Sequence, residues 1–122
     1  MTNEKKTVMV ADDDASILDV IEIMLAEVGG YHVETTNDGK TLLELDKKLP
    51  NLILLDLWMS GVDGRDICMH LKANEHTRHV PVIIFSANRD IDTIAADAGA
   101  DDYISKPFQM TELLEKVERL IN

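Results

Sequence analysis

A short apolar run near the middle of the chain most constrains the fold. Residues 52–55, LILL, show no polar alternation, which is typical of a strand buried on both faces of a parallel sheet, and they end directly at the carboxylate of Asp56. In open parallel sheets, ligands bind beyond the carboxyl ends of the strands. The sequence therefore predicts a parallel sheet in which Asp56 is presented to whatever binds.

Four further runs of apolar and β-branched residues are typical of strands, at residues 7–11, 31–36, 80–85 and 103–104. Between and after them, apolar residues recur at helical spacing. The first expected helix spans about residues 15–28 and is ended by left-handed backbone at Gly29 and Gly30. The other expected helices are one with Leu42, Leu45 and Leu49 closed by Pro50, one with Ile67, Cys68 and Leu71, one opened by residues 88–90 and ended by Gly99, and a last one with Leu113, Leu114, Val117, Leu120 and Ile121.

The alternation of five strands with five helices predicts an α/β fold with a doubly wound parallel sheet. Right-handed crossovers place helices on both faces, so we expect a three-layer sandwich. In the flavodoxin-like strand order 2-1-3-4-5, the first and third strands are neighbours, and their ends bring Asp12 and Asp13 beside Asp56. The acidic residues are then expected to form one site.

Length and charge restrict the class of protein further. A chain of 122 residues with 45% hydrophobic content suits one domain, which we expect to span residues 1–122. A net charge of -11 disfavours direct contact with nucleic acid. Cys68 is the single cysteine, so neither an intramolecular disulfide nor a cysteine metal set is expected. Without an apolar stretch typical of a signal peptide or a membrane span, the chain is expected to be cytoplasmic.

The converging carboxylates predict a cation site. Asp12, Asp13 and Asp56 would raise each other's pKa unless a cation lay among them, and hard oxygen ligands favour Mg²⁺. An aspartate beside Mg²⁺ can act as a nucleophile toward phosphorus. Ser86 and Lys106 follow the fourth and fifth strands, where a hydroxyl and an ammonium would contact phosphate oxygens. Taken singly, each is typical of a turn or surface position, and only their joint placement favours phosphoryl chemistry.

Four motifs together resemble the receiver domain of response regulators in bacterial two-component systems. They are DDD at 12–14, LLDLWMSGVDG at 54–64, FSA at 85–87 and ADDYISKPF at 100–108. Their order and spacing match over essentially the whole chain, so the combined signal is strong although each motif is weak alone.

The resemblance implies a role for each residue at the phosphorylation site. It implies Asp56 as the phosphoacceptor, Asp13 as a direct Mg²⁺ ligand and Asp12 as a ligand through water. The main-chain carbonyl of Trp58 is implied as a further ligand, and the Lys106 ammonium as the counter-ion of the phosphate.

The resemblance also implies a conformational switch. Ser86 would be the hydroxyl that senses phosphate, and Tyr103 the aromatic residue that turns inward on activation, with a cis peptide bond before Pro107. The surface made by the fourth helix, fifth strand and fifth helix would then change for a partner to recognise. A fixed, half-buried aromatic on an edge strand is the alternative interpretation of Tyr103.

Three positions are variable or unusual for this family. Ser60 stands where the family usually has proline, which would leave the loop freer without removing a ligand. Trp58 and Asn88 occupy the two variable positions that flank the phosphoryl group and modulate its hydrolysis. A bulky Trp58 is expected to shield the phosphorus from water.

The leading hypothesis is a phosphorylation-activated signalling switch that is no enzyme beyond its own phosphorylation and dephosphorylation. Its phosphodonor would be a sensor histidine kinase or a histidine phosphotransfer protein, and its downstream protein target is unknown. One alternative is an interaction module that is never phosphorylated, although such domains tend to lose the acid pair, the acceptor or the lysine. Another is a phosphatase with an aspartate nucleophile, which usually has a second acid where this chain has Trp58.

Several polar residues have ordinary structural interpretations. Asp14 is expected to cap the first helix, and Asp63 and Gly64 to form a turn and a helix start. Cys68 is expected in the core. The histidines show no ligand spacing. No output domain is expected within residues 1–122, so the chain would be a stand-alone regulator or a receiver excised from a longer protein.

Overall fold

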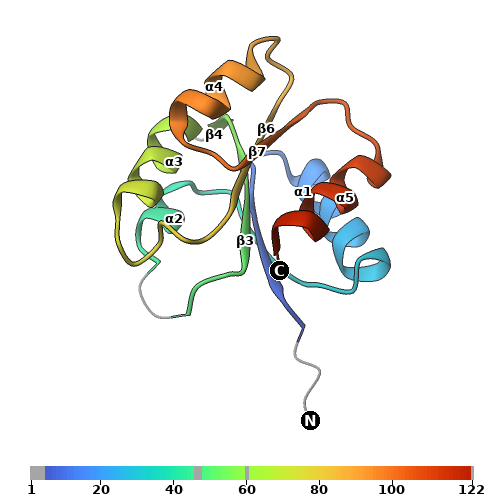
Figure 1. The fold of residues 1–122 in the computed structure, drawn as a ribbon. Coiled ribbons are helices and arrows are strands. Elements are labelled where there is room, and N and C mark those ends of the chain that lie inside the picture. Colours follow the sequence, from blue (N-terminus) through green and yellow to red (C-terminus); the bar gives the residue numbers. More distant parts are fainter. Residues whose placement is uncertain (1–4, 46–47, 60, 122) are drawn as a thin grey trace.

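Five parallel strands form the centre of the molecule in the order β2-β1-β3-β6-β7 (Figure 1). The computed structural model describes residues 5–45, 48–59 and 61–121. The predicted order 2-1-3-4-5 is confirmed, with β6 and β7 as the fourth and fifth strands of the sheet. The strands are β1 (Thr7–Ala11), β2 (His32–Thr36), β3 (Leu52–Asp56), β6 (Val82–Ser86) and β7 (Asp102–Ser105).

Helices cover both faces of this sheet, as the sequence predicts (Figure 1). One face is covered by α1 (Ala15–Ile23), which continues as the π-helical segment η1 (Met24–Val28), and by α5 (Met110–Ile121). The other face is covered by α2 (Lys40–Leu43), α3 (Gly64–Ala73) and α4 (Ile91–Ala98). The three-layer sandwich is therefore confirmed.

The central strand β3 explains why the sheet needs both layers. All five of its residues are buried. Ile53 and Leu55 belong to the core cluster beneath α3 and α4, whereas Leu52 and Leu54 belong to the cluster beneath α1 and α5. Because successive side chains of a strand point to opposite faces, a strand covered on both sides needs an uninterrupted apolar run.

The helix ends follow their predicted residues with one correction. The Asp14 side chain caps α1 by accepting hydrogen bonds from the main-chain N–H groups of Ser16 at 2.9 Å and Ile17 at 3.4 Å. Gly30 has the left-handed backbone expected, with φ of 76°. Gly29 was expected to share it and does not, since its φ is -79°. A Cβ there would lie 2.8 Å from the Leu25 carbonyl oxygen, so close packing is what requires glycine.

Two predicted elements differ from the structure by two or more residues at one end, whereas β2, β3 and β7 differ from their predicted bounds by one residue at an end. The helix α2 ends at Leu43, and Leu45 and Leu49 lie outside it, although both pack against the α3 face of the core. Their apolar spacing therefore reflects burial of two side chains at positions that are not helical. The strand β6 begins at Val82, later than the predicted residue 80, because Pro81 has no N–H to donate to a sheet.

The sequence did not predict the small hairpin that follows β3. Here β4 (Trp58–Met59) and β5 (Val62–Asp63) pair in antiparallel fashion directly before α3. Ser60, where the family usually has proline, lies outside the described residues, so the expected freedom of this loop stays a prediction.

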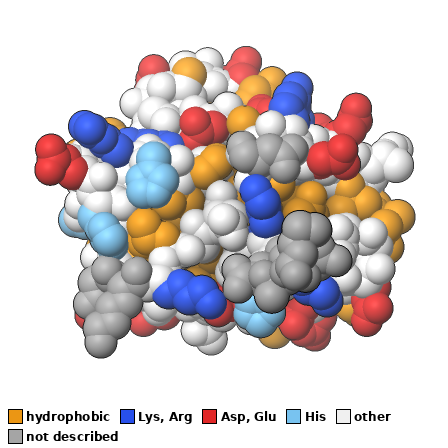
Figure 2. Space-filling model, turned by 60° about the horizontal axis from the view of Figure 1, so that its bottom comes forward, with side chains coloured by type: hydrophobic (Ala, Val, Ile, Leu, Met, Phe, Trp, Pro, Cys, Tyr) orange, Lys and Arg blue, Asp and Glu red, His pale blue; other side chains and the backbone are white. Residues whose placement is uncertain are grey.

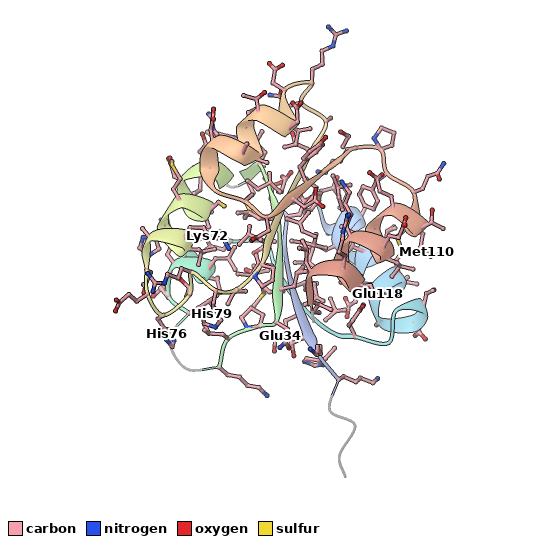
Figure 3. The ribbon with its side chains drawn as sticks, in the orientation of Figure 1. Glu34, Lys72, His76, His79, Met110 and Glu118 are labelled. Carbon is pink, nitrogen blue, oxygen red and sulfur yellow. The ribbon has the colours of Figure 1, made fainter. Side chains whose placement is uncertain are left out.

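The two ends of the sheet differ in character. Figure 2 turns the lower end of the molecule forward, where Lys, Arg and His side chains lie among acidic ones. His76 and His79 lie at this end, in the loop between α3 and β6 (Figure 3). The carboxyl ends of the strands lie at the opposite end, where the polar residues predicted to form a site are found. Within residues 5–45, 48–59 and 61–121, no helix is both long and apolar enough to cross a membrane.

Candidate functional site

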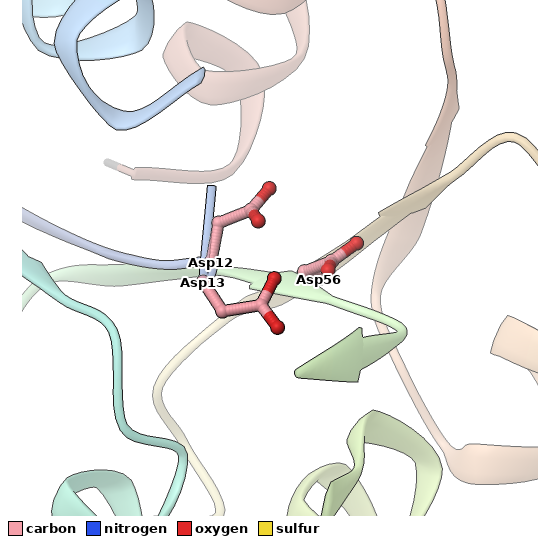
Figure 4. Close-up of side chains that lie close together, drawn as sticks. All are labelled: Asp12, Asp13 and Asp56. Carbon is pink, nitrogen blue, oxygen red and sulfur yellow. The ribbon is translucent and has the colours of Figure 1, made fainter. Parts of the chain in front are cut away.

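Three carboxylates meet where β1 and β3 end. The two strands are parallel neighbours, and Ala11 pairs with Leu55, so the residues that follow, Asp12 and Asp56, lie beside each other. Oxygen atoms of Asp12, Asp13 and Asp56 all lie within 4.8 Å of one another (Figure 4). Asp12 is 1% exposed and Asp56 8% exposed, whereas Asp13 faces solvent. The predicted convergence of the acidic residues is therefore observed.

Lys106 joins this cluster from the far edge strand of the sheet. Its Nζ donates to Asp12 Oδ2 at 3.2 Å and to Asp56 Oδ1 at 3.1 Å. The same ammonium lies 4.7 Å from the centre of the Phe85 ring, so the lysine stem crosses the end of β6 to reach the carboxylates. The peptide bond between Lys106 and Pro107 is cis, as expected.

Asp12 is held by the main chain as well as by the lysine. Its Oδ1 accepts a hydrogen bond from the main-chain N–H of Asp14 at 2.9 Å, while its Oδ2 faces Lys106. Because each oxygen has its own donor, the orientation of this buried carboxylate is defined. The start of α1 and the end of β7 thus contribute to the same cluster.

The burial of Asp56 alters its acidity. Burial raises the pKa of Asp56, the Lys106 ammonium lowers it, and the charges of Asp12 and Asp13 raise it. Removing a carboxylate from water and placing like charges beside it both disfavour ionisation. A divalent cation among the three carboxylates would relieve that repulsion, and their hard oxygen atoms fit Mg²⁺ or Ca²⁺.

Ser86 is the last residue of β6, and Asn88 follows it at the same edge of the sheet. Asp56 of β3 pairs with Phe85 of the neighbouring strand β6, and Ser86 is the next residue after Phe85. The Ser86 Oγ accepts from the main-chain N–H of Asn88 at 3.0 Å, and the Asn88 side chain accepts from that of Asp90 at 2.8 Å. Ser86 is therefore near the cluster, and both residues take part in the turn that leads into α4.

Trp58 extends from the hairpin that follows Asp56. Its side chain is 60% exposed, and its main chain pairs with Asp63 in β5. Asp63 caps α3 as predicted, by accepting from the main-chain N–H of Arg65 at 2.8 Å. The hairpin thus places the exposed indole ring of Trp58 two residues after Asp56 in the chain.

Sequence reasoning missed the role of Gly64 in shaping this edge. A Cβ at Gly64 would clash with the main-chain oxygen of Asp56 and would lie 2.9 Å from that of Leu57. The Gly64 N–H also donates to the Leu57 carbonyl at 2.5 Å. Only a glycine lets the start of α3 lie this close to the end of β3. The glycine at the end of the motif at residues 54–64 was the sequence feature that could have indicated this close approach.

Tyr103 lies on the edge strand β7 and is half-buried. Its ring packs against the core cluster on the α3 and α4 face. The ammonium of Lys116 from α5 lies 4.7 Å from the centre of this ring, a contact that the sequence did not suggest. The expected inward turn of Tyr103 stays a prediction.

An apolar cavity of about 450 Å³ lies next to Lys106. It is bounded by α1 on one side and by the segment after β7 on the other. Residues that line it include Ile17, Val20, Ile21, Met24, Pro107 and Phe108. Val20 is 48% exposed, so the cavity opens to solvent, and Lys106 links its lining to the acidic cluster.

The fold and this cluster together define an α/β domain with a group of carboxylates, able to hold a cation, at the point where the strand order reverses. The family model of the response regulator receiver domain matches residues 8–118. The chain therefore belongs to the response regulator receiver domain family of two-component signalling, as its motifs suggest.

Curated relatives support this membership. The chain is 40% identical over 117 residues to a DNA-binding dual master transcriptional regulator, RpaA, of a Synechocystis species, with 93% of this chain and 48% of the relative covered. It is 36% identical over 120 residues to the DNA-binding response regulator MtrA of Mycobacterium tuberculosis, with 96% and 51% covered. The chain spans about half the length of these curated relatives.

Solved structures of similar fold include other receivers. A response regulator structure from Chloroflexus aurantiacus has a TM-score of 0.88 at 29% identity, covering 97% of this chain and 98% of that one. The receiver domain of a sensor histidine kinase from Pseudomonas aeruginosa has a TM-score of 0.87 at 29% identity, with the same coverage. That domain is described with a magnesium ion coordinated in its active-site cleft.

Proposed function

We propose that this chain is a Mg²⁺-dependent signalling switch that is turned on when Asp56 accepts a phosphoryl group. The observation that carries the proposal is the meeting of three carboxylates within 4.8 Å, with the Lys106 ammonium 3.1 Å from Asp56. A carboxylate nucleophile, a cation site and a fixed lysine are the components that phosphoryl transfer to aspartate needs.

In the proposed transfer, an oxygen of Asp56 forms a bond to phosphorus as the bond between phosphorus and the leaving group breaks. The leaving group, a histidine imidazole or acetate, keeps the electron pair of that bond. Lys106 exchanges its contact with the Asp56 carboxylate for one with a phosphoryl oxygen, and the Ser86 hydroxyl donates to another. Two of the phosphoryl oxygens are thereby contacted, one by Ser86 of β6 and one by Lys106 directly after β7, while Asp56 of β3 holds the phosphorus.

The cation is assigned to the carboxylates of Asp12, Asp13 and Asp56, with Asp13 binding directly and Asp12 through water, and to the main-chain carbonyl of Trp58. The exposure of Asp13 beside two buried carboxylates supports this assignment, since Mg²⁺ usually keeps several of its waters. When bound, Mg²⁺ would neutralise charge between the carboxylates and the phosphoryl oxygens. A related receiver with magnesium in its cleft supports the choice of ion.

The phosphodonor is proposed to be a sensor histidine kinase or a histidine phosphotransfer protein. The apolar cavity beside Lys106 supports contact there, because a partner that delivers a phosphoryl group to Asp56 must cover the adjoining surface. The cytoplasmic location expected from the sequence stays a prediction. So does the expectation that residues 1–122 form a single receiver domain.

The output is proposed to be a change in the surface made by α4, β7 and α5. Ser86 would move toward the phosphoryl group, and the Tyr103 ring would turn into the space left behind. The downstream target of this chain is proposed to be a protein. Its curated relatives are DNA-binding regulators, and the net charge of -11 favours protein contact for the receiver itself.

Incubation with acetyl phosphate and Mg²⁺ tests the proposal. We expect a gain of about 80 Da, the mass of one phosphoryl group, in the intact chain and none in Asp56→Asn, since aspartate can hold phosphate covalently. Asp14→Asn is the matched control, because it removes a neighbouring charge while asparagine still caps a helix. Equal labelling of Asp56→Asn would contradict the proposal, and no labelling of any chain would favour a module that is never phosphorylated.

A further inference from the structure

A side chain that contacts the Tyr103 ring comes from the helix layer on the opposite face of the sheet. Tyr103 packs against the cluster beneath α3 and α4, whereas α5 contributes Leu113, Val117 and Ile121 to the cluster on the other face. Because β7 is an edge strand, Lys116 can reach from α5 around that edge to the tyrosine.

The Lys116 ammonium is fixed by oxygen atoms as well as by the ring. It donates to the main-chain carbonyl of Tyr103 and to Asp102 Oδ1 at 3.3 Å, and it lies 3.8 Å from Glu112 Oε2. Its side chain is only 17% exposed. The three oxygen partners do not belong to the tyrosine ring, so the ammonium stays in position when that ring rotates.

The ring contact therefore favours one position of Tyr103. The ammonium lies 4.7 Å from the ring centre, within the range of a cation–π interaction. Rotation of the ring away from Lys116 would lose this contact and keep the others. We propose that Lys116 is a positioning residue that restrains the Tyr103 ring and so sets how readily the switch turns on. This inference rests on the proposed function, in which the ring moves on activation.

Arg119 provides a matched comparison on the same helix. Its Nη2 lies 3.3 Å from Asp102 Oδ2, so it shares the acidic partner of Lys116, and its side chain is 64% exposed. Removing the charge of Arg119 therefore alters the ion pairs of Asp102 but leaves the Lys116 ammonium at the Tyr103 ring. Lys116→Arg keeps a cation at the ring itself and should preserve the restraint.

The first measurement needs no phosphodonor. The chain has two tyrosines, so ring-labelled protein gives separate NMR signals for Tyr31 and Tyr103. A soluble paramagnetic probe broadens the signals of exposed rings, with Tyr31 as the internal reference. We expect Lys116→Met to reduce the broadening of Tyr103 relative to Tyr31, because the unrestrained ring spends more time inward. Lys116→Arg and Arg119→Gln should behave like the native chain.

The second measurement is the rate of phosphorylation by acetyl phosphate with Mg²⁺. Loss of a cation–π contact should shift the ring equilibrium by about two- to tenfold, and Lys116→Met should be phosphorylated faster by a similar factor. Lys116→Gln is a second variant, since it removes the charge and keeps a donor for the Tyr103 carbonyl.

The inference is overturned if both uncharged variants leave the Tyr103 signal and the phosphorylation rate unchanged. It is also overturned if Arg119→Gln reproduces the effects, since they would then follow from Asp102 and not from the ring. If no chain is phosphorylated, the proposed function fails, and the ring measurement alone still decides whether Lys116 restrains Tyr103.

Discussion

The positive charge of Lys106 allows the buried carboxylates of Asp12 and Asp56 to lie side by side. Its ammonium contacts Asp12 at 3.2 Å and Asp56 at 3.1 Å, and it lowers the pKa of Asp56, which burial raises. Removing one member of a buried ion pair leaves an uncompensated charge, which is strongly destabilising. The same lysine therefore stabilises the unphosphorylated cluster and is available to a phosphoryl group.

Trp58 is expected to slow the loss of the phosphoryl group. Its exposed indole follows Asp56 by two residues, and Trp58→Ala should admit water and speed dephosphorylation by up to about tenfold, or ~1.4 kcal/mol in the barrier. The rate is measured as loss of labelled phosphate after acetyl phosphate is removed. Met69→Ala, which removes an exposed apolar side chain from α3, is the control. An unchanged rate in Trp58→Ala would exclude this shielding.

Cys68 is expected to be unreactive in the folded chain. The thiol is fully buried, and burial raises its pKa to about 11, with Lys72 lowering it and Asp101 raising it by smaller amounts. At pH 8 a thiol reagent should modify the urea-unfolded chain and spare the native one, because the thiolate is the nucleophile.

The raised pKa of Cys68 also predicts the sign of a pH effect on stability. The folded thiol stays protonated while the unfolded thiol ionises above about pH 8.5, so this contribution is complete below that pH and is lost as the pH rises toward 11. Between pH 7 and pH 10, the free energy of unfolding measured with urea should fall less for Cys68→Ala than for the native chain. Rapid labelling of the native chain at pH 8 would show that the thiol is not protected.

At the scale of the secondary-structure elements, the site depends on how closely α3 approaches β3. The hairpin of β4 and β5 turns the chain back after Asp56, and Gly64 then begins α3 against the main chain of Asp56 and Leu57. The helix start is thus placed against the strand end that carries the central carboxylate. Any side chain at position 64 would push these two elements apart.

Gly64→Ala should therefore impair both stability and phosphorylation. Overpacking against main-chain atoms costs about 1–3 kcal/mol, which urea unfolding would measure. Phosphorylation by acetyl phosphate should slow because Asp56 and the Trp58 carbonyl shift. Gly30→Ala is the control: its φ of 76° makes alanine strained, but nothing lies within 4 Å of the added Cβ. Normal phosphorylation of Gly64→Ala would show that this close approach is not required.

At the scale of the whole molecule, the cation site couples to folding. Asp12 and Asp13 follow β1, and Asp56 ends β3, so the three carboxylates come together only in the folded sheet. A ligand that binds only the folded state stabilises it by mass action. The repulsion among these carboxylates adds to the self-repulsion expected of a chain with a net charge of -11.

Mg²⁺ should therefore raise the midpoint of thermal unfolding. At a concentration about 100 times its dissociation constant, one bound ion adds about 2.7 kcal/mol to stability. Thermal unfolding followed by circular dichroism, with and without Mg²⁺, measures the shift. Asp13→Asn should lose most of it, whereas Asp14→Asn should keep it, since that residue caps α1. An equal shift in both variants would argue against Asp13 as a ligand.

The sheet and the members of the acidic cluster could be predicted from the sequence because each has a local signal. A strand covered on both faces needs a continuous apolar run, so residues 52–55 indicated a central strand. Ligand sites of parallel sheets lie at the carboxyl ends of strands, so the polar residue that ends each run was a site candidate. Asp12, Asp56 and Lys106 are together for that reason.

Other features depended on contacts that no local pattern encodes. Leu45 and Leu49 have helical spacing, yet burial against the α3 face holds them outside a helix. Gly64 is required by main-chain atoms of β3, and Lys116 reaches Tyr103 only because β7 is an edge strand. Sequence alone thus determined the buried strands and the polar residues at their ends, since hydrophobic periodicity and strand ends are local. Tertiary structure alone decided how closely Gly64 approaches β3 and which cation lies at the Tyr103 ring, because residues from other elements set both contacts.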